Sequence, residues 1–383
     1  MLFRSVLARL PDAPAGSAGI SLFAVPKMNA DGSRNGVACL SLEHKLGIHA
    51  SPTCVMGFEG ALGEMVGAPN RGLPAMFAMM NAARLGVAMQ GVAVAERAFR
   101  RAVDFAGQRA QGGVTIDRHP DVRRMLLTQK AIAEGGRAMV YGAAKIADKM
   151  FNSVVEGDQA KYKKYDDELG FYTPILKGFL TEMGLEAANL GMQVFGGHGY
   201  IGEHGMEQIA RDARISTLYE GTTGIQALDL LGRKVLLNTK GKCVRDFSGT
   251  VLRFAKPYAL QRTPMGQLAR TLARRTAQWN LLTALIMLRA SKDREQVGSS
   301  SVDYLMYSGF VMMAYYWALQ AAKATELLGS GTGKESKDFY TAKIQTAEFY
   351  FARLLPRADG HYSAALAPTS AVMQMPQELF QMA

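Results

Sequence analysis

The residues best suited to chemistry lie around Glu220. There an apolar run gives way to Tyr219-Glu220-Gly221-Thr222-Thr223, so a carboxylate stands beside a glycine and two threonines. A threonine at 222 or 223 can cap a new helix, whose first N–H groups have no partner within the helix. Two interpretations of Glu220 remain. It is either a general base whose pKa rises when substrate excludes water, or a carboxylate whose role is only to interact with the positive N-terminal end of that helix.

A second candidate is the glycine-rich segment between Gln193 and Tyr200. Glycines at 196, 197 and 199 allow backbone N–H groups to approach a ligand closely, and a nest of such donors attracts phosphate oxygens. The same glycines also suit a helix C-cap followed by a turn. The pattern alone leaves both interpretations open.

No metal site is indicated by the histidines or the cysteines. The six histidines show no HxxxH spacing, and Cys39, Cys54 and Cys243 form no CxxC pair. An odd number of widely spaced cysteines favours a reducing compartment, so we expect a cytoplasmic protein. The methionines between 76 and 89 are interpreted as adaptable core packing rather than as a substrate lining.

Composition narrows the class of protein. The chain has 383 residues, 48% hydrophobic and 20% charged, which excludes wholesale disorder and a small disulfide-framed domain. Its net charge of +11 suits a phosphate-bearing cofactor, an anionic membrane or a nucleic acid. No basic stripe is interleaved with aromatic residues, so nucleic acid is disfavoured. The uncharged stretch from Tyr304 to Ala322 is interpreted as a buried helix rather than a membrane span.

The elements that must position these residues follow from periodicity and from turn signals. Residues 20–25 and 37–42 are predicted as strands around a turn at 29–36. Apolar spacing of three and four predicts long helices over 73–105 and 120–150. A third helix is predicted to start at Thr173-Pro174 and to end near Phe195, before Gly196. Shorter helices are predicted before Tyr219 and just after Gly221. Residues 250–330 and 336–356 are predicted to be helical again.

These elements predict a mostly α protein in three parts. Residues 1–70 are predicted as a β region, residues 71–240 as a helical bundle with the chemical motifs, and residues 245–383 as a further helical domain. The loop at Lys240-Gly241-Lys242 marks the last boundary.

Several motifs together resemble the acyl-CoA dehydrogenase family. They are YEGTTGIQALDLLGRK, the preceding GGHGYIGE loop, and LGIHASPTC followed by a glycine-rich link to a long helix. The long form with an extra C-terminal helical domain, which includes the methylmercaptopropionyl-CoA dehydrogenase type, fits best. The resemblance implies FAD as cofactor, an acyl-CoA thioester as substrate and a trans-2-enoyl-CoA as product.

The resemblance also implies roles for individual residues. Glu220 matches the base that removes the α proton while hydride passes to FAD, and Gly221 lies beside it on the substrate side. Arg109 matches an arginine that pairs with the FAD pyrophosphate, although composition alone favours a solvated arginine. Arg84 matches an arginine near the base and the CoA-binding edge. The remaining FAD contacts implied by the resemblance are Gln193, Gly196, Gly197, Thr222 and Gly224.

This sequence departs from the family pattern at some of those positions. Asn81 stands where relatives often carry an acid that contacts CoA, and Gly224 stands where many carry glutamine. His119-Pro120 replaces a polar pair near the adenine end and receives no role. The resemblance further implies a homodimer or homotetramer and an electron-transfer flavoprotein as acceptor.

The resemblance implies that residues 1–70 are the C-terminal part of the family's middle β domain and that residues 71–240 contain its four-helix bundle. It implies a fragment without the N-terminal helical domain and without part of the flavin pocket, so we expect residues 1–383 alone to have little or no dehydrogenase activity. The alternative is a catalytically inactive helical interaction subunit or scaffold derived from the same family.

Overall fold

The computed structural model describes residues 3–382, which divide into two compact units, Met1–Arg84 and Leu85–Ala383. The first unit contains two antiparallel sheets. One has the order β1-β2-β5, and the other pairs β3 with β4. The strands are β1 Phe3–Arg9, β2 Ile20–Pro26, β3 Val37–Leu42, β4 Cys54–Phe58 and β5 Glu64–Val66, with a short 3-10 helix, η1 Gly16–Gly19. The strands predicted at 20–25 and 37–42 are confirmed.

The second unit is helical, and the division between the units falls within α1. Its principal helices are α1 Gly72–Gln108, α2 Pro120–Val155, α3 Gln159–Phe195, α7 Lys242–Ala259, α8 Pro264–Ala290, α9 Glu295–Ser330 and α10 Lys337–Phe349. Shorter helices are α4 Gly197–Tyr200, α5 Met206–Arg214, α6 Thr223–Leu228, α11 Ala358–Ala365 and α12 Ser370–Met373. Single turns and π-helical segments are η2 Ile116–Arg118, η3 Gly202–His204, η4 Ile215–Thr217, η5 Asp229–Asn238, η6 Tyr350–Leu354, η7 Leu355–Arg357 and η8 Gln377–Gln381.

The predicted start of the third helix was wrong. Helix α3 begins at Gln159, where the Asp158 side chain accepts a 2.9 Å hydrogen bond from the Lys161 N–H and caps the first turn. Thr173 instead lies inside the helix, and its hydroxyl donates to the Leu169 carbonyl at 2.8 Å. Pro174 is an interior proline, tolerated in a buried stretch of the helix. The predicted end at Phe195 is confirmed.

A two-residue hairpin follows α1. Strands β6 Ala110–Gln111 and β7 Val114–Thr115 pair across Gly112 and Gly113, which have φ of +64° and +82°. Two consecutive positive φ angles are what the tight turn of a twisted hairpin needs, and glycine adopts them without steric cost. The hairpin turns the chain from α1 into α2 directly after Arg109.

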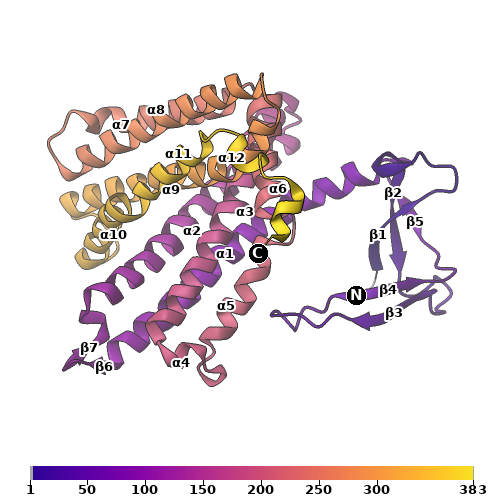
Figure 1. Ribbon diagram of the computed structural model, residues 1–383, viewed down its shortest axis with the longest axis horizontal. Coiled ribbons are helices and arrows are strands. Elements are labelled where there is room, and N and C mark those ends of the chain that lie inside the picture. Colours follow the sequence, from indigo (N-terminus) through magenta and orange to yellow (C-terminus); the bar gives the residue numbers. More distant parts are fainter. Residues whose placement is uncertain (1–2, 383) are drawn as a thin grey trace. The chain divides into compact units, whose positions relative to one another are not determined.

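Helix α9 is the centre of the helical core. It packs between the α7–α8 pair and the α2–α3 pair, as Figure 1 shows. Glycines bring the helices close: a Cβ on Gly135 of α2 would lie 2.4 Å from the Trp317 indole nitrogen, and one on Gly309 of α9 would lie 2.2 Å from the Phe179 ring. Most of the stretch 304–322 is buried, so its prediction as a core helix is confirmed.

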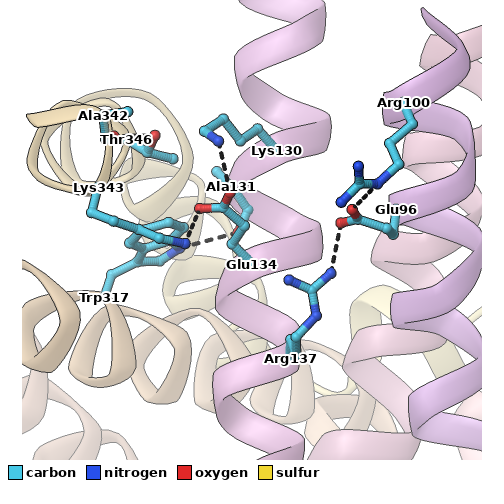
Figure 2. Close-up of polar contacts among 10 residues, drawn as sticks. All are labelled: Glu96, Arg100, Lys130, Ala131, Glu134, Arg137, Trp317, Ala342, Lys343 and Thr346. Atoms are coloured by element: carbon cyan, nitrogen blue, oxygen red, sulfur yellow. Dashed lines mark hydrogen bonds and ion pairs between the residues drawn. The ribbon is translucent and has the colours of Figure 1, made fainter. Parts of the chain in front are cut away.

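Ion pairs and one indole hydrogen bond link the same helices (Figure 2). Glu134 on α2 accepts from Lys130 at 2.7 Å and from Lys343 on α10 at 2.8 Å. The Trp317 indole N–H donates to the Ala131 carbonyl at 3.1 Å. The C-terminal helices therefore share one hydrophobic core with the bundle. The predicted division into domains at 70 and 240–245 stays a prediction about boundaries.

Among the described residues, one helix, α1, has the length and apolar composition of a membrane span. From Val87 to Ala106 its buried residues belong to the core of the helical unit. In the most apolar stretch of α1, 29% of the residues are buried.

Candidate active site

The backbone around Glu220 is locally strained. Glu220 has a φ of +56° and Gly221 a φ of +93°, between η4 and α6. A left-handed conformation costs a residue with a Cβ about 1–2 kcal/mol, so the surrounding contacts must hold Glu220 there. Its side chain is half-buried. The turn thus presents a carboxylate in a conformation that the local sequence alone does not favour.

Two buried side chains hold this turn through its carbonyl groups. Lys177 of α3 is fully buried, and its Nζ donates to the Gly221 carbonyl at 2.6 Å. The Nε2 of Gln226, also fully buried, donates to the Glu220 carbonyl at 3.1 Å and to the Gly221 carbonyl at 3.3 Å. Sequence reasoning missed both residues. The available signal was a single lysine inside the apolar run ILKGFL.

Tyr219 fixes the other side of the turn. Its hydroxyl donates to the Gln90 side chain on α1, within the helical unit. Burial raises the pKa of the Tyr219 hydroxyl and the charge of Glu220 adds to the rise, while the hydrogen bond to Gln90 partly lowers it. The Glu220 carboxylate is therefore close enough to the ring hydroxyl to be felt electrostatically.

The predicted helix after Gly221 is confirmed, with Thr222 as its cap. The Thr222 hydroxyl accepts from the Ile225 N–H at 3.3 Å, and α6 begins at Thr223. The Thr223 hydroxyl donates to Glu182 of α3 at 2.5 Å. The first turn of α6, which includes Gly224, thus points its N–H groups beside the Glu220 turn and is anchored to α3.

Four predicted cofactor residues line one hollow. Arg109, Gln193, Gly196 and Gly197 border a cavity of about 550 Å³ at the end of α1, beside the β6–β7 hairpin and the turn after α3. Gly196 has a φ of +59° and separates α3 from α4. The glycine segment is therefore a helix end, as one of the two interpretations predicts, and it also borders a cavity. Its contact with a ligand stays a prediction.

The chemistry of this hollow is cationic and open. The Arg109 guanidinium is exposed, and its Nη1 donates to the neighbouring Ala110 carbonyl at 2.6 Å. Among the described residues, no carboxylate lies within ion-pair distance of Arg109. A Cβ at Gly196 or Gly197 would meet no atom within 4 Å, so the backbone there stands open. An anionic group could approach both features.

A second hollow, of about 720 Å³, lies beside the first turn of α6. Gln193 lines both hollows, and Thr223 and Glu182 line the second. Gln193 is itself exposed. Gln193 therefore borders two hollows of the helical unit, one with Arg109 and the glycine turn and the other with Thr223 at the start of α6.

The two remaining predicted residues belong to the first unit. Asn81 is exposed and Arg84, one turn later on α1, is buried. Both lie before the division between the units. Their roles at the CoA-binding edge stay predictions.

Comparison with known proteins identifies the chain's relatives. The family model "Acyl-CoA dehydrogenase, C-terminal domain" matches residues 70–236, and "Acetyl-CoA dehydrogenase C-terminal like" matches residues 247–376. The 3-methylmercaptopropionyl-CoA dehydrogenase of Ruegeria pomeroyi is 40% identical over 94% of this chain and 62% of its own length. The broad-specificity linear acyl-CoA dehydrogenase FadE5 of Mycobacterium tuberculosis is 34% identical over 93% of this chain and 62% of its own.

Solved structures show the same fold. An acyl-CoA dehydrogenase from Bacillus anthracis in complex with FAD superposes with a TM-score of 0.78 at 20% identity, over 100% of this chain and 62% of that chain. Caenorhabditis elegans ACDH-11 in complex with C11-CoA gives 0.75 at 22% identity, over 92% and 57%. The chain thus spans about three-fifths of the length of these relatives. Residues 70–236 therefore carry the C-terminal domain of the acyl-CoA dehydrogenase family, and the chain has the fold of these enzymes.

Proposed function

We propose that this chain takes part in the flavin-dependent α,β-dehydrogenation of an acyl-CoA thioester to a trans-2-enoyl-CoA, with Glu220 as the base. One observation carries the proposal: Glu220 is held in a left-handed turn by the buried donors of Lys177 and Gln226. A strained backbone over-determined by buried contacts is typical of a functional position. The match of residues 70–236 to the C-terminal domain of acyl-CoA dehydrogenases supports the choice of reaction.

The residues present fit the phosphate and backbone needs of FAD. The exposed Arg109 guanidinium supplies a cation for a pyrophosphate, and the open backbone at Gly196 and Gly197 allows close approach of a ligand. Gln193 offers an amide in the same hollow, and Thr222 and Gly224 lie at the start of α6. Bound there, FAD would supply the acceptor for the hydride that leaves the β carbon.

The protein's own residues would carry the proton chemistry. The α proton of a thioester is weakly acidic, so its removal needs a positioned base and hydrogen-bond donors aimed at the carbonyl oxygen. Glu220 takes the proton on its carboxylate. The family resemblance assigns its own backbone N–H as a donor to the thioester oxygen, which makes the left-handed turn at 220 and 221 a device that orients base and donor together.

The substrate side of the proposal includes Gly221, Asn81 and Arg84. Gly221 flanks the base, and Asn81 and Arg84 would contact the CoA portion. The names of the relatives suggest acyl groups for the first assays, including 3-methylmercaptopropionyl-CoA and butyryl-CoA. We further propose an electron-transfer flavoprotein as the acceptor, a dimeric or tetrameric homo-oligomer, and a cytoplasmic location.

The test combines binding with single-turnover chemistry. The purified chain is first titrated with FAD, and binding is followed by fluorescence. The complex is then mixed anaerobically with an acyl-CoA, and the loss of absorbance of the oxidised flavin is followed. Glu220→Gln should abolish bleaching and keep acyl-CoA binding. The exposed Glu335 supplies a matched control, since Glu335→Gln should behave as wild type.

Two outcomes bear on the proposal differently. A chain that binds neither FAD nor acyl-CoA contradicts the proposed function and favours the scaffold alternative. A chain that binds both but turns over slowly fits the prediction that residues 1–383 alone have little activity. Turnover equal to that of a full-length relative would contradict that prediction.

A further inference from the structure

The first unit carries two cysteines on one face of its smaller sheet. In the β3–β4 ladder, Cys39 lies opposite Met56 and Cys54 lies opposite Leu42. Side chains alternate between the two faces of a strand, so Cys54 shares its face with Met56 and hence with Cys39. The two cysteines are therefore diagonal neighbours across the ladder.

An irregularity in β3 lies between the two positions of this diagonal pair. The register shifts between Cys39 and Ser41, which leaves Leu40 as an additional residue on β3. Diagonal neighbours in a regular ladder have Cα atoms about 7–8 Å apart, slightly beyond the reach of a disulfide. A bulge bends its strand and increases the local twist, which changes that separation. The Cys39 thiol also lies 3.5 Å from the Ser41 carbonyl, inside the bulge.

The two thiols interact with each other. Donation of the Cys39 S–H toward the Cys54 sulfur raises the pKa of the Cys39 thiol, with a smaller rise from burial, while the charge of Arg4 on β1 acts in the opposite direction. All three cysteines of the chain are free thiols. Two reduced cysteines on one face of a ladder, at diagonal positions across a bulge, need only a small backbone movement to form a disulfide.

A small reagent can reach this pair. Cys39 is exposed and Cys54 is half-buried. Met56 and Phe58, which share their face, line a cavity of about 730 Å³ together with residues of β1. Cys243, by contrast, is half-buried in the helical unit, and burial raises the pKa of its thiol. The chain thus contains one accessible pair and one separate thiol that can serve as an internal reference.

We propose that Cys39 and Cys54 form a site of reversible disulfide formation with a low-molecular-weight disulfide such as oxidised glutathione. One cysteine thiolate attacks a glutathione sulfur, the glutathione S–S bond breaks, and one glutathione thiolate leaves. The second cysteine then attacks the mixed disulfide and releases the other glutathione. Two electrons pass from the cysteine pair to the oxidant, and two protons leave the cysteines. The site is independent of the proposed dehydrogenase function.

The disulfide would close the connection between β3 and β4. This connection holds Ile48 with a φ of +43°, and Lys45, whose Nζ donates to the Ile48 carbonyl at 3.1 Å. Trypsin cleaves after Arg34, Lys45 and Arg71, so Cys39 and Cys54 fall on the adjacent peptides 35–45 and 46–71. A bond between the two cysteines therefore links two peptides that are otherwise separated by digestion.

The experiment treats the folded chain with oxidised glutathione, blocks the remaining thiols with iodoacetamide and maps the tryptic peptides by mass spectrometry. We expect peptides 35–45 and 46–71 to be linked, at a yield at least about tenfold above any pair that includes Cys243, because only the first two sulfurs are neighbours in the fold. Dithiothreitol should separate them. Digestion of a mixture of ¹⁴N-labelled and ¹⁵N-labelled chains should yield links within one label only.

Variants keep the result unambiguous. Cys39→Ser and Cys54→Ser should each abolish the link and leave the other cysteine as a mixed disulfide with glutathione, while Cys243→Ser should leave the link unchanged. Oxidation of the unfolded chain in guanidinium should remove the selectivity. The proposal is overturned if Cys39 and Cys54 in the folded chain carry separate glutathiones, if mixed-label links form, or if both remain open to iodoacetamide.

Discussion

The Glu220 turn and the Arg109 hollow belong to the same helical unit but are built in opposite ways. The turn is strained and is held by two fully buried side chains, Lys177 and Gln226. The hollow is open: Arg109 is exposed, and a Cβ added to Gly196 or Gly197 would meet no atom within 4 Å. Contacts within the protein fix the turn, whereas the side chain and backbone groups of the hollow face open space.

With the roles proposed above, Glu220 as base and the hollow as a phosphate site, this difference has a physical reason. A base must already be oriented when the substrate arrives, because reorganising it during the reaction would add to the barrier. A phosphate-binding region instead gains from cations and N–H groups whose partners the ligand itself supplies. We therefore expect substitutions at the turn to affect rate and stability together, and substitutions at the hollow to affect mainly cofactor affinity.

The largest effect is expected at Lys177. Lys177→Met keeps an unbranched side chain but removes the donor to the Gly221 carbonyl, so the turn loses its hold on Glu220. We expect the flavin-bleaching rate to fall about 100-fold and the free energy of unfolding to fall by about 2 kcal/mol. Denaturant titration and stopped-flow absorbance measure the two effects. Lys145, exposed on α2, provides the control substitution Lys145→Met. An unchanged bleaching rate in Lys177→Met would show that the hydrogen bond from Lys177 to the Gly221 carbonyl is not needed to position Glu220.

The next effect is expected at Arg109. Arg109→Ala removes a charged donor from the hollow, and we expect the affinity for FAD to fall at least about tenfold. Stability should change by no more than about 0.5 kcal/mol, since the side chain is exposed. Arg118, an exposed arginine outside the hollow, is the matched control. If Arg109→Ala and Arg118→Ala lose the same affinity for FAD, the loss comes from general electrostatic attraction and not from a contact in the hollow.

A smaller effect is expected from Gly197. Gly197→Ala adds a methyl group where no protein atom lies within 4 Å, so the chain should fold with unchanged stability. FAD affinity should fall by about threefold to tenfold, because the methyl group keeps the ligand from the backbone. Gly298→Ala on α9, which also has open space, should leave FAD binding as in wild type. Fluorescence titration with FAD distinguishes the two variants. Full affinity in Gly197→Ala would place the cofactor elsewhere.

The smallest effect concerns α1, which serves both regions because it carries Gln90 near the turn and Arg109 at its end. Glu96 of α1 accepts from Arg137 at 2.6 Å and from Arg100 at 2.5 Å (Figure 2). Burial raises the pKa of Glu96, but the bonds from the two arginines outweigh it and hold the pKa below its ordinary value of 4.5.

A carboxyl group whose pKa is lower in the folded chain than in the unfolded chain stabilises the fold at pH values above its pKa in the unfolded chain. This stabilisation is lost as the pH falls through its pKa in the folded chain. Arg137→Met should therefore cost about 1 kcal/mol at neutral pH and progressively less as the pH falls below 4.5. Urea titrations of both proteins across that range measure the difference. Arg97→Met, on α1 with no carboxylate partner among the described residues, should show no such pH dependence. If the difference in the free energy of unfolding between wild type and Arg137→Met does not change with pH, ionisation of Glu96 is not its cause.

Local signals in the sequence predicted much of this molecule. The strands at 20–25 and 37–42, the end of α3 before Gly196 and the cap at Thr222 all follow from turn and capping residues, whose effects act over a few positions. The start of α3 was mispredicted because Thr173-Pro174 has the form of a helix start. Asp158 supplied the true cap, and burial made the interior proline tolerable.

The sequence by itself determined the helices, the carboxylate at 220 and the glycines at 196 and 197, because propensity, capping and motif spacing are written in neighbouring residues. Only the tertiary structure decided that Lys177 and Gln226 hold the Glu220 turn, that Arg109 shares a hollow with Gln193, and that Cys39 and Cys54 lie on one face of the β3–β4 ladder. Those contacts depend on which face of a helix or strand is turned toward another, and that orientation is fixed by packing between segments far apart in the chain.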